Sequence, residues 1–386
     1  MNVVCLLIFG QSIFTASVYA HIFGKTTPKI TVSEEDLLDQ LVNASVPRIQ
    51  HDFRTGQKWM EALVRTFGYE RNYYAVVVDC GSSGSRVHAY KFRIPENAPV
   101  VFGGQPQLEV VSELFEMTHP GLSAYANSPL QGAAVIFDLV SEAQNLVPRP
   151  RRSDTPLIIR ATAGMRMLPK HKANKLLWTV YNRVSRCGYD MTPGVRIMEG
   201  SEEGIYLWYS VNWLMNRFDK ESYAALDLGG GSTQITFEID EESATMYPPD
   251  NIHRIHDVKN YTIFTHSYLN MGRFAARFGI LLKDANNEST YVNTPCMHPG
   301  YKNIQAQYKP PGGVAKMYSF SGLPYPSSMS NKEVLDRCVK NVKSFIDKTI
   351  DGLMPRVRGG GVVGVSYLHD LAAITGVIDA QPRNDK

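Results

Sequence analysis

The chain repeats one short pattern, and this repeat constrains its fold more than any other feature. The segment DCGSSGS at 79–85 ends an apolar run at 73–79, and DLGGGST at 227–233 ends a similar run 148 residues later. Each copy predicts a buried strand, a turn of small residues and a second strand, at 85–92 and at 232–239. Two such units indicate two related domains with a cleft between them.

Strands and helices alternate around the two copies. Apolar runs predict strands at 156–162, 195–198 and 223–229, and helical spacing of apolar residues predicts helices at 131–146, 165–184 and 201–218. This alternation predicts an α/β fold. A length of 386 residues fits two domains of ~100–200 residues each.

The composition excludes several classes of protein. Apolar residues make up 44% of the chain and charged residues 20%, which is ordinary for a globular protein. The net charge of +3 is too small for a strongly basic nucleic-acid binder, so we expect no nucleic-acid partner. The ten histidines form no HxxxH pair, and none is expected to be catalytic or to bind a metal.

The two loops carry residue types that bind phosphate. Glycines let the backbone approach a ligand, and successive backbone N–H groups in such turns bind anions. Hydroxyl donors are added by Ser82, Ser83, Ser232 and Thr233. Asp79 and Asp227 would repel phosphate unless a cation lay between them, so the loops predict Mg²⁺ or Ca²⁺ held through water. The alternative is two glycine-rich hairpins in which the aspartate only caps the turn.

Two further motifs lie at predicted helix starts. RATAGMR at 160–166 places Thr162 where a helix N-terminus binds anions. Arg166 either clamps a phosphate or pairs with a surface carboxylate. GSEEG at 200–204 places a carboxylate where it can act as a general base toward water. The alternative for Glu202 and Glu203 is that they only complement the helix dipole.

The N-terminus predicts entry into the secretory pathway. Residues 1–20 carry no charged side chain, and Val18 and Ala20 fit a cleavage site, so we interpret them as a signal peptide. An uncleaved membrane anchor is the alternative. Residues 21–72 form an N-terminal extension, and sequons at Asn43, Asn260 and Asn287 become usable. We expect a protein that is secreted or lies in the ER or Golgi lumen, with no stable membrane span after cleavage.

Four cysteines remain once the signal peptide is removed. An oxidising lumen permits disulfides, and four cysteines allow three pairings. Cys296 and Cys338 flank the same loop-rich stretch, so we predict that they pair. Cys80 is expected to be a small buried apolar residue.

The motifs together resemble a known family. DCGSSGSR, ATAGMR, GSEEGIYLW and DLGGGSTQ match, in order, the first four signature regions of the apyrases, or nucleoside triphosphate diphosphohydrolases. IMEGSEEGIYLW and THSYLNMG are most similar to the soluble nucleoside-diphosphatase branch of the ER, the Golgi and secretions. The resemblance covers 73–380 and implies the actin/Hsp70/sugar-kinase fold, with two RNase H-like domains around a central cleft. Domain I is then 73–195 plus 360–386, and domain II is 196–359.

The resemblance also implies roles for residues that match these motifs. Glu203 matches the general base, and Ser232 and Gln234 match the pair that positions the attacking water. The metal set is Asp79 and Asp227, through the waters of Ca²⁺ or Mg²⁺, with Trp208 near the metal. The phosphate-binding set is Ser82, Ser83, Gly84, Ser85, Thr162, Gly229, Gly230, Gly231 and Thr233.

The implied activity is metal-dependent release of the terminal phosphate of nucleoside diphosphates such as UDP, GDP or ADP, with triphosphates as a further substrate class. Water attacks directly, and no phosphoenzyme is needed. Three alternatives stay open: a phosphatase of the exopolyphosphatase type, a kinase of the same fold, and a nucleotide-binding or scavenging protein with weak catalysis. The chain stops near Asp379, short of the family pattern, and GVVGVSYLHD lacks the aromatic residues usual in the fifth region. Nucleobase preference and oligomeric state therefore stay open.

Overall fold

Two five-stranded sheets form the centre of the fold. The computed structural model describes residues 72–94, 100–101, 105–106, 109–215, 217, 220–256, 260–285, 289–308, 316–323, 329–350, 355–357 and 360–378. The expected signal peptide, the extension up to residue 71, and the sequons at Asn43 and Asn287 lie outside the described residues. Within the described part of the chain, no helix has the length and apolar character of a membrane span.

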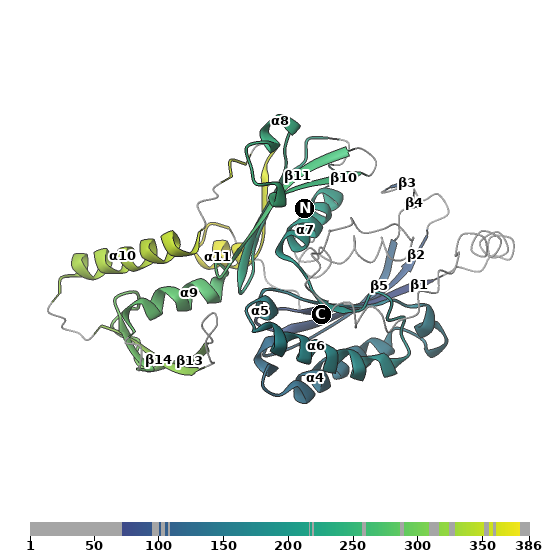
Figure 1. Cartoon of the computed structure of the whole chain (residues 1–386), viewed down its shortest axis with the longest axis horizontal. Helices are drawn as coiled ribbons and strands as arrows, with labels where there is room; N and C mark the ends of the chain where they lie inside the picture. Colours follow the sequence, from purple (N-terminus) through teal and green to yellow (C-terminus); the bar gives the residue numbers. More distant parts are fainter. Residues whose placement is uncertain are drawn as a thin grey trace.

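Sheet I has the strand order β5–β2–β1–β6–β7. Its strands are β1 (Tyr73–Cys80), β2 (Ser85–Arg93), β5 (Glu109–Thr118), β6 (Leu157–Ala161) and β7 (Val195–Ile197). β2 pairs antiparallel with β1 and β5, whereas β6 pairs parallel with β1 and β7. Helices α4 (Pro129–Glu142) and α6 (Lys170–Val184) pack side by side on one face of this sheet (Figure 1). The apolar side chains between sheet and helices form the core of domain I.

Sheet II has the strand order β10–β11–β9–β8–β15. Its strands are β8 (Ala224–Leu228), β9 (Ser232–Glu238), β10 (Ile252–His256), β11 (Asn260–Leu269) and β15 (Val362–Ser366). β9 pairs antiparallel with β8 and β11, and β15 pairs parallel with β8, as β6 does with β1. The two sheets therefore share one topology over four strands, and the predicted α/β fold of the actin/Hsp70/sugar-kinase type, with two related domains, is confirmed.

The pairing of β15 corrects the expected domain division. Segment 360–386 was expected to belong to domain I, and this is wrong for its described part, because Val362 pairs with Ala224 and Ser366 with Leu228 in sheet II. The apolar run of β15 completes sheet II at the position that β6 holds in sheet I. β7 also crosses the expected boundary at 195/196, since all three of its residues belong to sheet I.

Two predicted helices differ in their ends. The helix expected at 165–184 is divided into α5 (Ala163–Arg166) and α6, because Pro169 lacks an N–H group and stands at the start of α6. The helix expected at 201–218 is α7 (Gly200–Leu214) and ends before residue 218. The hairpins β1–β2 and β8–β9 lie where the repeat predicts them.

Helix α7 packs against β8, β9 and β11 of sheet II. Two glycines permit this approach: a Cβ at Gly200 would collide with Ser267, and one at Gly204 would collide with Thr236 and Thr265. Those two threonines are buried and joined by a hydrogen bond of 2.7 Å between their Oγ1 atoms. Because the two glycines of GSEEG have no Cβ, the backbone at the start of α7 can lie directly against sheet II.

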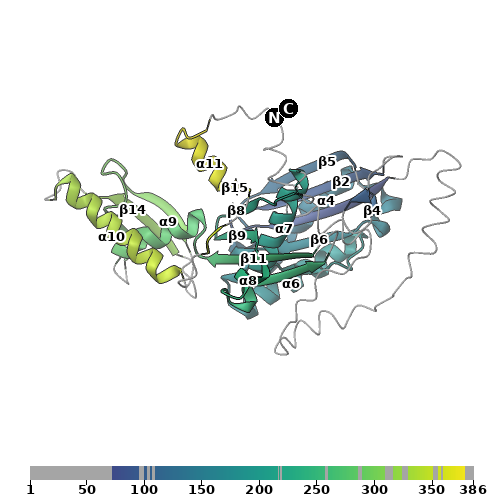
Figure 2. The same ribbon diagram turned by 90° about the horizontal axis from the view of Figure 1, so that it is seen from above.

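A third unit lies to one side of the two sheets (Figure 2). It contains α9 (Arg273–Leu281), α10 (Asn331–Thr349) and the strands β12 (Tyr291–Thr294), β13 (Ile304–Tyr308) and β14 (Lys316–Gly322). A disulfide joins Cys296 to Cys338 and confirms the predicted pairing. Cys80 is fully buried and unbridged, as expected. The remaining elements are β3 (Val100–Val101), β4 (Gln105–Pro106), α8 (Glu241–Ala244) and α11 (Tyr367–Ile374).

Candidate active site

Both glycine-rich turns occupy the same place in their sheets. In domain I, Asp79 near the end of β1 pairs across the hairpin with Arg86. In domain II, Asp227 near the end of β8 pairs with Gln234. The repeat in sequence is therefore also a repeat in strand register, and Arg86 and Gln234 stand at equivalent positions.

Small residues let the two turns approach one another. A Cβ added at Gly230 would collide with the Ser82 hydroxyl, and one at Gly164 would lie 2.9 Å from the Ser82 Cα. A Cβ at Gly231 would lie 3.0 Å from the Ala163 Cβ. Both glycine-rich turns and the start of α5 therefore meet at one point. Larger side chains there would separate the two domains.

Glu203 lies beside this meeting point, in the first turn of α7. Its Oε2 atom accepts hydrogen bonds from Arg166 Nη2 and Gln234 Nε2, each 2.9 Å long. Burial raises the pKa of Glu203 to about 7; the charge of Arg166 opposes this shift, whereas Asp227 and Asp79 add to it. A carboxylate with this pKa can take a proton from water near neutral pH.

Ser232 and Gln234 lie against Glu203. Gln234 Nε2 lies 2.7 Å from Ser232 Oγ and 2.9 Å from both Ser267 Oγ and Glu203 Oε2, so its two hydrogens are shared among three acceptors. Its Oε1 atom is buried and has no hydrogen-bond partner among the described residues. A buried acceptor of this kind is costly unless a ligand or water donates to it. The structure thus brings together the three residues that the motifs assign to catalysis.

Arg166 pairs with a carboxylate, but not with one on the surface. Its side chain is 11% exposed, and besides Glu203 it donates to Ser232 Oγ at 3.1 Å and to the Met198 carbonyl at 2.8 Å. The guanidinium comes from α5 of domain I, whereas Glu203 and Ser232 belong to α7 and β9. Arg166 therefore ties α5 of domain I to Glu203 and Ser232 of domain II.

The residues present fit a divalent cation held through water. Asp227 is buried, and its Oδ1 atom has no hydrogen-bond partner among the described residues. Burial, with the nearby charge of Asp79, raises the pKa of Asp227 to about 6, although a hydrogen bond with Ser366 and the charge of Arg86 oppose this shift. No group of three or more described His, Cys, Asp or Glu side chains is arranged to ligate a metal directly. Two neighbouring carboxylates without a full protein ligand shell are typical of Mg²⁺ or Ca²⁺ bound with water and substrate oxygens.

Asp79 has a protein cation beside it. Arg86 Nη1 donates to Asp79 Oδ2 at 3.0 Å, and this contact lowers the pKa of a carboxyl group that burial raises. The two aspartates of the repeat are thus not equivalent: Asp79 has a guanidinium partner across its hairpin, whereas the residue opposite Asp227 in the register is Gln234, whose amide bonds to Glu203.

Trp208 lies five residues after Glu203, on the same helix. It is fully buried, and its ring contacts Tyr261 and Tyr209 edge-on, with centroids 5.4 Å apart in both pairs. The indole therefore helps to hold α7 on sheet II. Its expected place near the metal stays a prediction.

The expected phosphate-binding residues lie in or next to the two turns and at the start of α5. Ser85 and Thr162 are buried, and Thr162 is the N-cap residue of α5. Thr233 Oγ1 donates to the Met271 carbonyl at 2.8 Å, so its hydroxyl has a backbone partner. Ser83 Oγ lies 3.4 Å from the hydroxyl of Tyr367 at the start of α11. Phosphate contacts by these residues stay predictions.

Sequence analysis missed three residues of this region. Arg86 stands where the second copy of the repeat has Gln234, so an alignment of the two copies would have singled it out. Ser267 and Tyr367 come from β11 and α11, far from the motifs they contact. No local pattern identifies such partners, because strand pairing brings them in.

The fold and the site define a class: proteins built on two actin-like domains that meet at two glycine-rich turns. The chain belongs to the GDA1/CD39 (nucleoside phosphatase) family, whose signature matches residues 67–350. The resemblance to the apyrase family is thereby confirmed.

Named relatives agree with this family. The chain is 32% identical over 327 residues to nucleoside-diphosphatase uda-1 of Caenorhabditis elegans, covering 79% of this chain and 64% of that protein. It is 31% identical to the human nucleoside diphosphate phosphatase ENTPD5, covering 84% of this chain and 75% of that protein. It is 31% identical to apyrase of Solanum tuberosum, with coverage of 89% and 73%. The chain thus spans less than two thirds of the worm protein and about three quarters of the other two.

Among solved structures, the chain is similar to nucleoside triphosphate hydrolases from Neospora caninum. The TM-score is 0.44 at 14% identity, and the match covers 82% of this chain and 68% of that chain.

Proposed function

We propose that the protein hydrolyses the terminal phosphate of nucleoside diphosphates and that the reaction depends on a divalent cation. The observation that carries this proposal is the buried group of Glu203, Gln234 and Ser232 beside the meeting point of the two glycine-rich turns. Two relatives are named as nucleoside diphosphatases, which supports a diphosphate as the substrate.

The residues divide the work of the reaction. Glu203 takes the proton of the attacking water, and Gln234 Oε1 accepts that water's second hydrogen bond, which orients its lone pair toward phosphorus. The backbone N–H groups of the two turns hold the phosphoryl oxygens. Asp79 and Asp227 would hold the waters of Mg²⁺ or Ca²⁺, and the bound cation would neutralise charge on the phosphates.

Phosphate release from a panel of substrates tests this function. The panel contains UDP, GDP, ADP, their triphosphates and polyphosphate, each with Mg²⁺, Ca²⁺ or EDTA. We expect cation-dependent release from diphosphates, and release that EDTA abolishes. Absence of release from every nucleotide would contradict an enzyme and leave nucleotide binding. Faster release from polyphosphate than from any nucleotide would favour a phosphatase of the exopolyphosphatase type.

A substitution at the base tests the mechanism. Glu203→Gln keeps the side-chain shape and should reduce kcat by about 10²–10⁴-fold, which is the usual contribution of a general base. Glu242→Gln is the matched control, because Glu242 is an exposed acid in the first turn of another helix, α8. Equal activity of Glu203→Gln and the wild type would contradict the assignment of the base.

We further infer that the protein passes through the secretory pathway. The disulfide Cys296–Cys338 fits an oxidising compartment, and Asn260, the sequon within the described residues, is exposed. Expression in a eukaryotic secretory system should give a glycosylated protein whose apparent mass falls after glycosidase treatment. Asn260→Gln should remove one glycan. An unmodified protein in the cytosol would contradict this route.

A further inference from the structure

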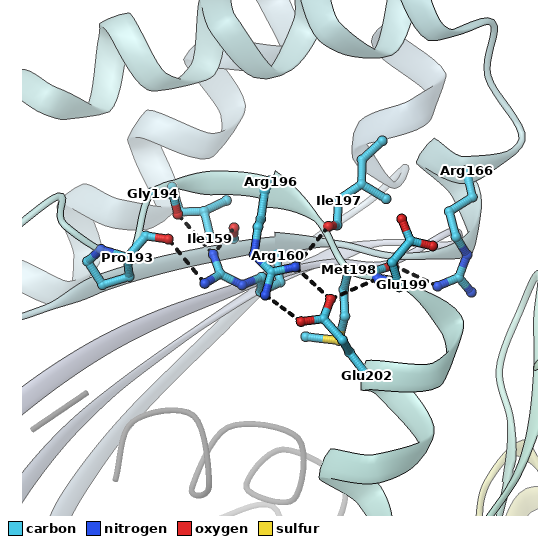
Figure 3. Close-up of polar contacts among 10 residues, drawn as sticks. All are labelled: Ile159, Arg160, Arg166, Pro193, Gly194, Arg196, Ile197, Met198, Glu199 and Glu202. Carbon is cyan, nitrogen blue, oxygen red and sulfur yellow. Dashed lines mark hydrogen bonds and ion pairs between the residues drawn. The ribbon is translucent and has the colours of Figure 1, made fainter. Parts of the chain in front are cut away.

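Glu202 and Glu203 are adjacent acids with partners in opposite directions. Glu203 accepts a hydrogen bond from Arg166. Glu202 instead accepts from Arg196 on β7, the edge strand of sheet I (Figure 3). We propose that Glu202 and Arg196 form a clamp between the two domains that positions Glu203 for proton transfer. The clamp rests on the proposed function, and its two members are positioning residues rather than catalytic ones.

The clamp is a two-point ion pair. Arg196 Nη1 donates to Glu202 Oε2 and Arg196 Nη2 donates to Glu202 Oε1, both at 2.6 Å. Paired bonds of this kind fix the direction of a carboxylate as well as its distance. Arg196 belongs to β7 of domain I, and Glu202 belongs to α7 on sheet II. The pair therefore bridges the point where the chain passes from one domain to the other.

The connection between β7 and α7 is short and held on both sides. Met198 and Glu199 are its two residues. The backbone N–H of Glu199 donates to Glu202 Oε2 at 3.0 Å, and these two acids form a reciprocal capping box. The Met198 carbonyl accepts from Arg166, which also binds Glu203. The clamp and Arg166 thus hold the same two-residue connection, one on each side.

The position of Glu203 depends on this connection. Its backbone N–H donates to the Glu199 carbonyl at 3.0 Å in the first turn of α7. A shift of Glu202 therefore also shifts Glu203, because both residues are hydrogen-bonded to the backbone of Glu199, the N-cap of α7. A displacement of about 1 Å at a reacting group costs about 10²-fold in rate. Without the Glu202 side chain, the connection would lose its bond at the Glu199 N–H and would keep the bonds of Met198 to Arg166 and to the Ala161 carbonyl.

A second arginine lies beside the clamp. Arg160 on β6 stands opposite Arg196 in the strand register and donates to the carbonyls of Ile159, Gly194 and Pro193. Burial, then the charge of Arg196, lower the pKa of Arg160 to about 10. The charge of Glu202 acts on both guanidiniums, and although burial opposes it, Arg196 holds the pKa of Glu202 below its ordinary value. Removing this carboxylate takes away the hydrogen-bonded partner of Arg196 and leaves Arg160 and Arg196 to repel one another more strongly.

The test compares Glu202→Gln, Arg196→Lys and Arg196→Met with a matched pair on the surface. Arg254 and Glu241 form the same two-point contact far from the turns, so Glu241→Gln and Arg254→Met are the controls. The readouts are kcat and KM for UDP with Mg²⁺, the Mg²⁺ concentration for half-maximal rate, and Tm.

We expect Glu202→Gln and Arg196→Met to lower kcat by about 10–100-fold, as a shifted base does, while KM and the half-maximal Mg²⁺ concentration change less than about twofold. Arg196→Lys, which keeps the charge and loses the second bond, should fall between Arg196→Met and the wild type. The double variant should lose no more than the worse single variant, because the pair acts as a unit. The control variants should keep kcat.

If the wild type is active, either of two results would overturn the clamp. The first is a kcat of Glu202→Gln equal to that of the controls. The second is a loss of kcat that follows the loss of folded protein and disappears at a temperature where the variant is fully folded. An inactive wild type contradicts the proposed function instead, so the two failures are distinguishable.

Discussion

Arg166 and Glu203 form a buried ion pair of 2.9 Å that joins the two domains at the candidate active site. The side chains are 11% and 9% exposed, so water screens the pair weakly. The guanidinium has two further acceptors, Ser232 Oγ and the Met198 carbonyl. The guanidinium therefore binds both Glu203 and the connection between the domains, and three of its five N–H donors are used in these contacts.

The first prediction concerns the pH dependence of kcat. Burial raises the pKa of Glu203 to about 7, so below that pH the protonated form dominates and the residue cannot accept a proton. Phosphate release should therefore rise with pH up to about 7 and then level off. The check is a profile from about pH 5 to about pH 9 at saturating substrate and cation. A flat profile down to about pH 5 would contradict a base with this pKa.

The second prediction concerns Arg166. Its charge lowers the pKa of Glu203, so Arg166→Met should move the acid limb of the profile to higher pH by about 1 unit or more and should reduce kcat. Arg166→Lys should keep the limb closer to the wild-type position. Arg183→Met is the control, because Arg183 lies over the Phe137 ring on the outer side of domain I. An unchanged acid limb in Arg166→Met would show that the pair does not set the proton affinity of the base.

The third prediction concerns the close packing of α7 against sheet II at Gly204. Gly204→Ala places a methyl group against the hydroxyls of Thr236 and Thr265, which are buried and bonded to one another. We expect a loss of about 1–3 kcal/mol in the free energy of unfolding, as for other overpacked sites. Urea unfolding measures it. Gly360→Ala is the control, since its methyl group would meet the ends of the Glu221 and Arg217 side chains; equal midpoints for the two variants would contradict the tight contact.

The fourth prediction concerns the disulfide. Cys296 and Cys338 are 42 residues apart in sequence, and a cross-link over such a loop is worth up to about 4 kcal/mol in the chain-entropy treatment. Reduction should lower the Tm of the wild type, and a Cys296→Ser/Cys338→Ser variant should show the lower Tm without a reductant. Because Glu203 and Gln234 lie outside this unit, phosphate release below the transition should persist. A further fall in Tm when the variant is reduced would assign the effect to another cysteine.

Local pattern was sufficient for much of the fold and of the site. The hairpins around 79–85 and 227–233 and the start of α7 follow from motifs of fewer than ten residues. The pairing of Cys296 with Cys338 was predicted because both flank one loop-rich stretch, although three pairings were open. The roles of Glu203, Ser232 and Gln234 come from the family resemblance and stay predictions, and the structure places the three side chains in contact.

The rest depends on contacts between distant segments. The apolar run of β15 has no local sign of the sheet it joins, and the pairing with β8 in domain II decides it. The partner of Arg166 was equally open, because an arginine at a helix end bonds whatever carboxylate the other domain supplies. Pro169 was a local signal for the break between α5 and α6, and it was outweighed by the apolar periodicity on both sides.

The matched register of the two hairpins has a consequence for the direction of the reaction. A perfect duplicate would present the same groups from both sides, and a chain of phosphates could enter with either end first. The two copies differ at several equivalent positions, and at one of them the first carries the guanidinium of Arg86 and the second carries the amide of Gln234 next to Glu203. These differences break the twofold symmetry. If Glu203 and Gln234 hold the attacking water as proposed, the water lies on the side of domain II and a substrate has one productive orientation.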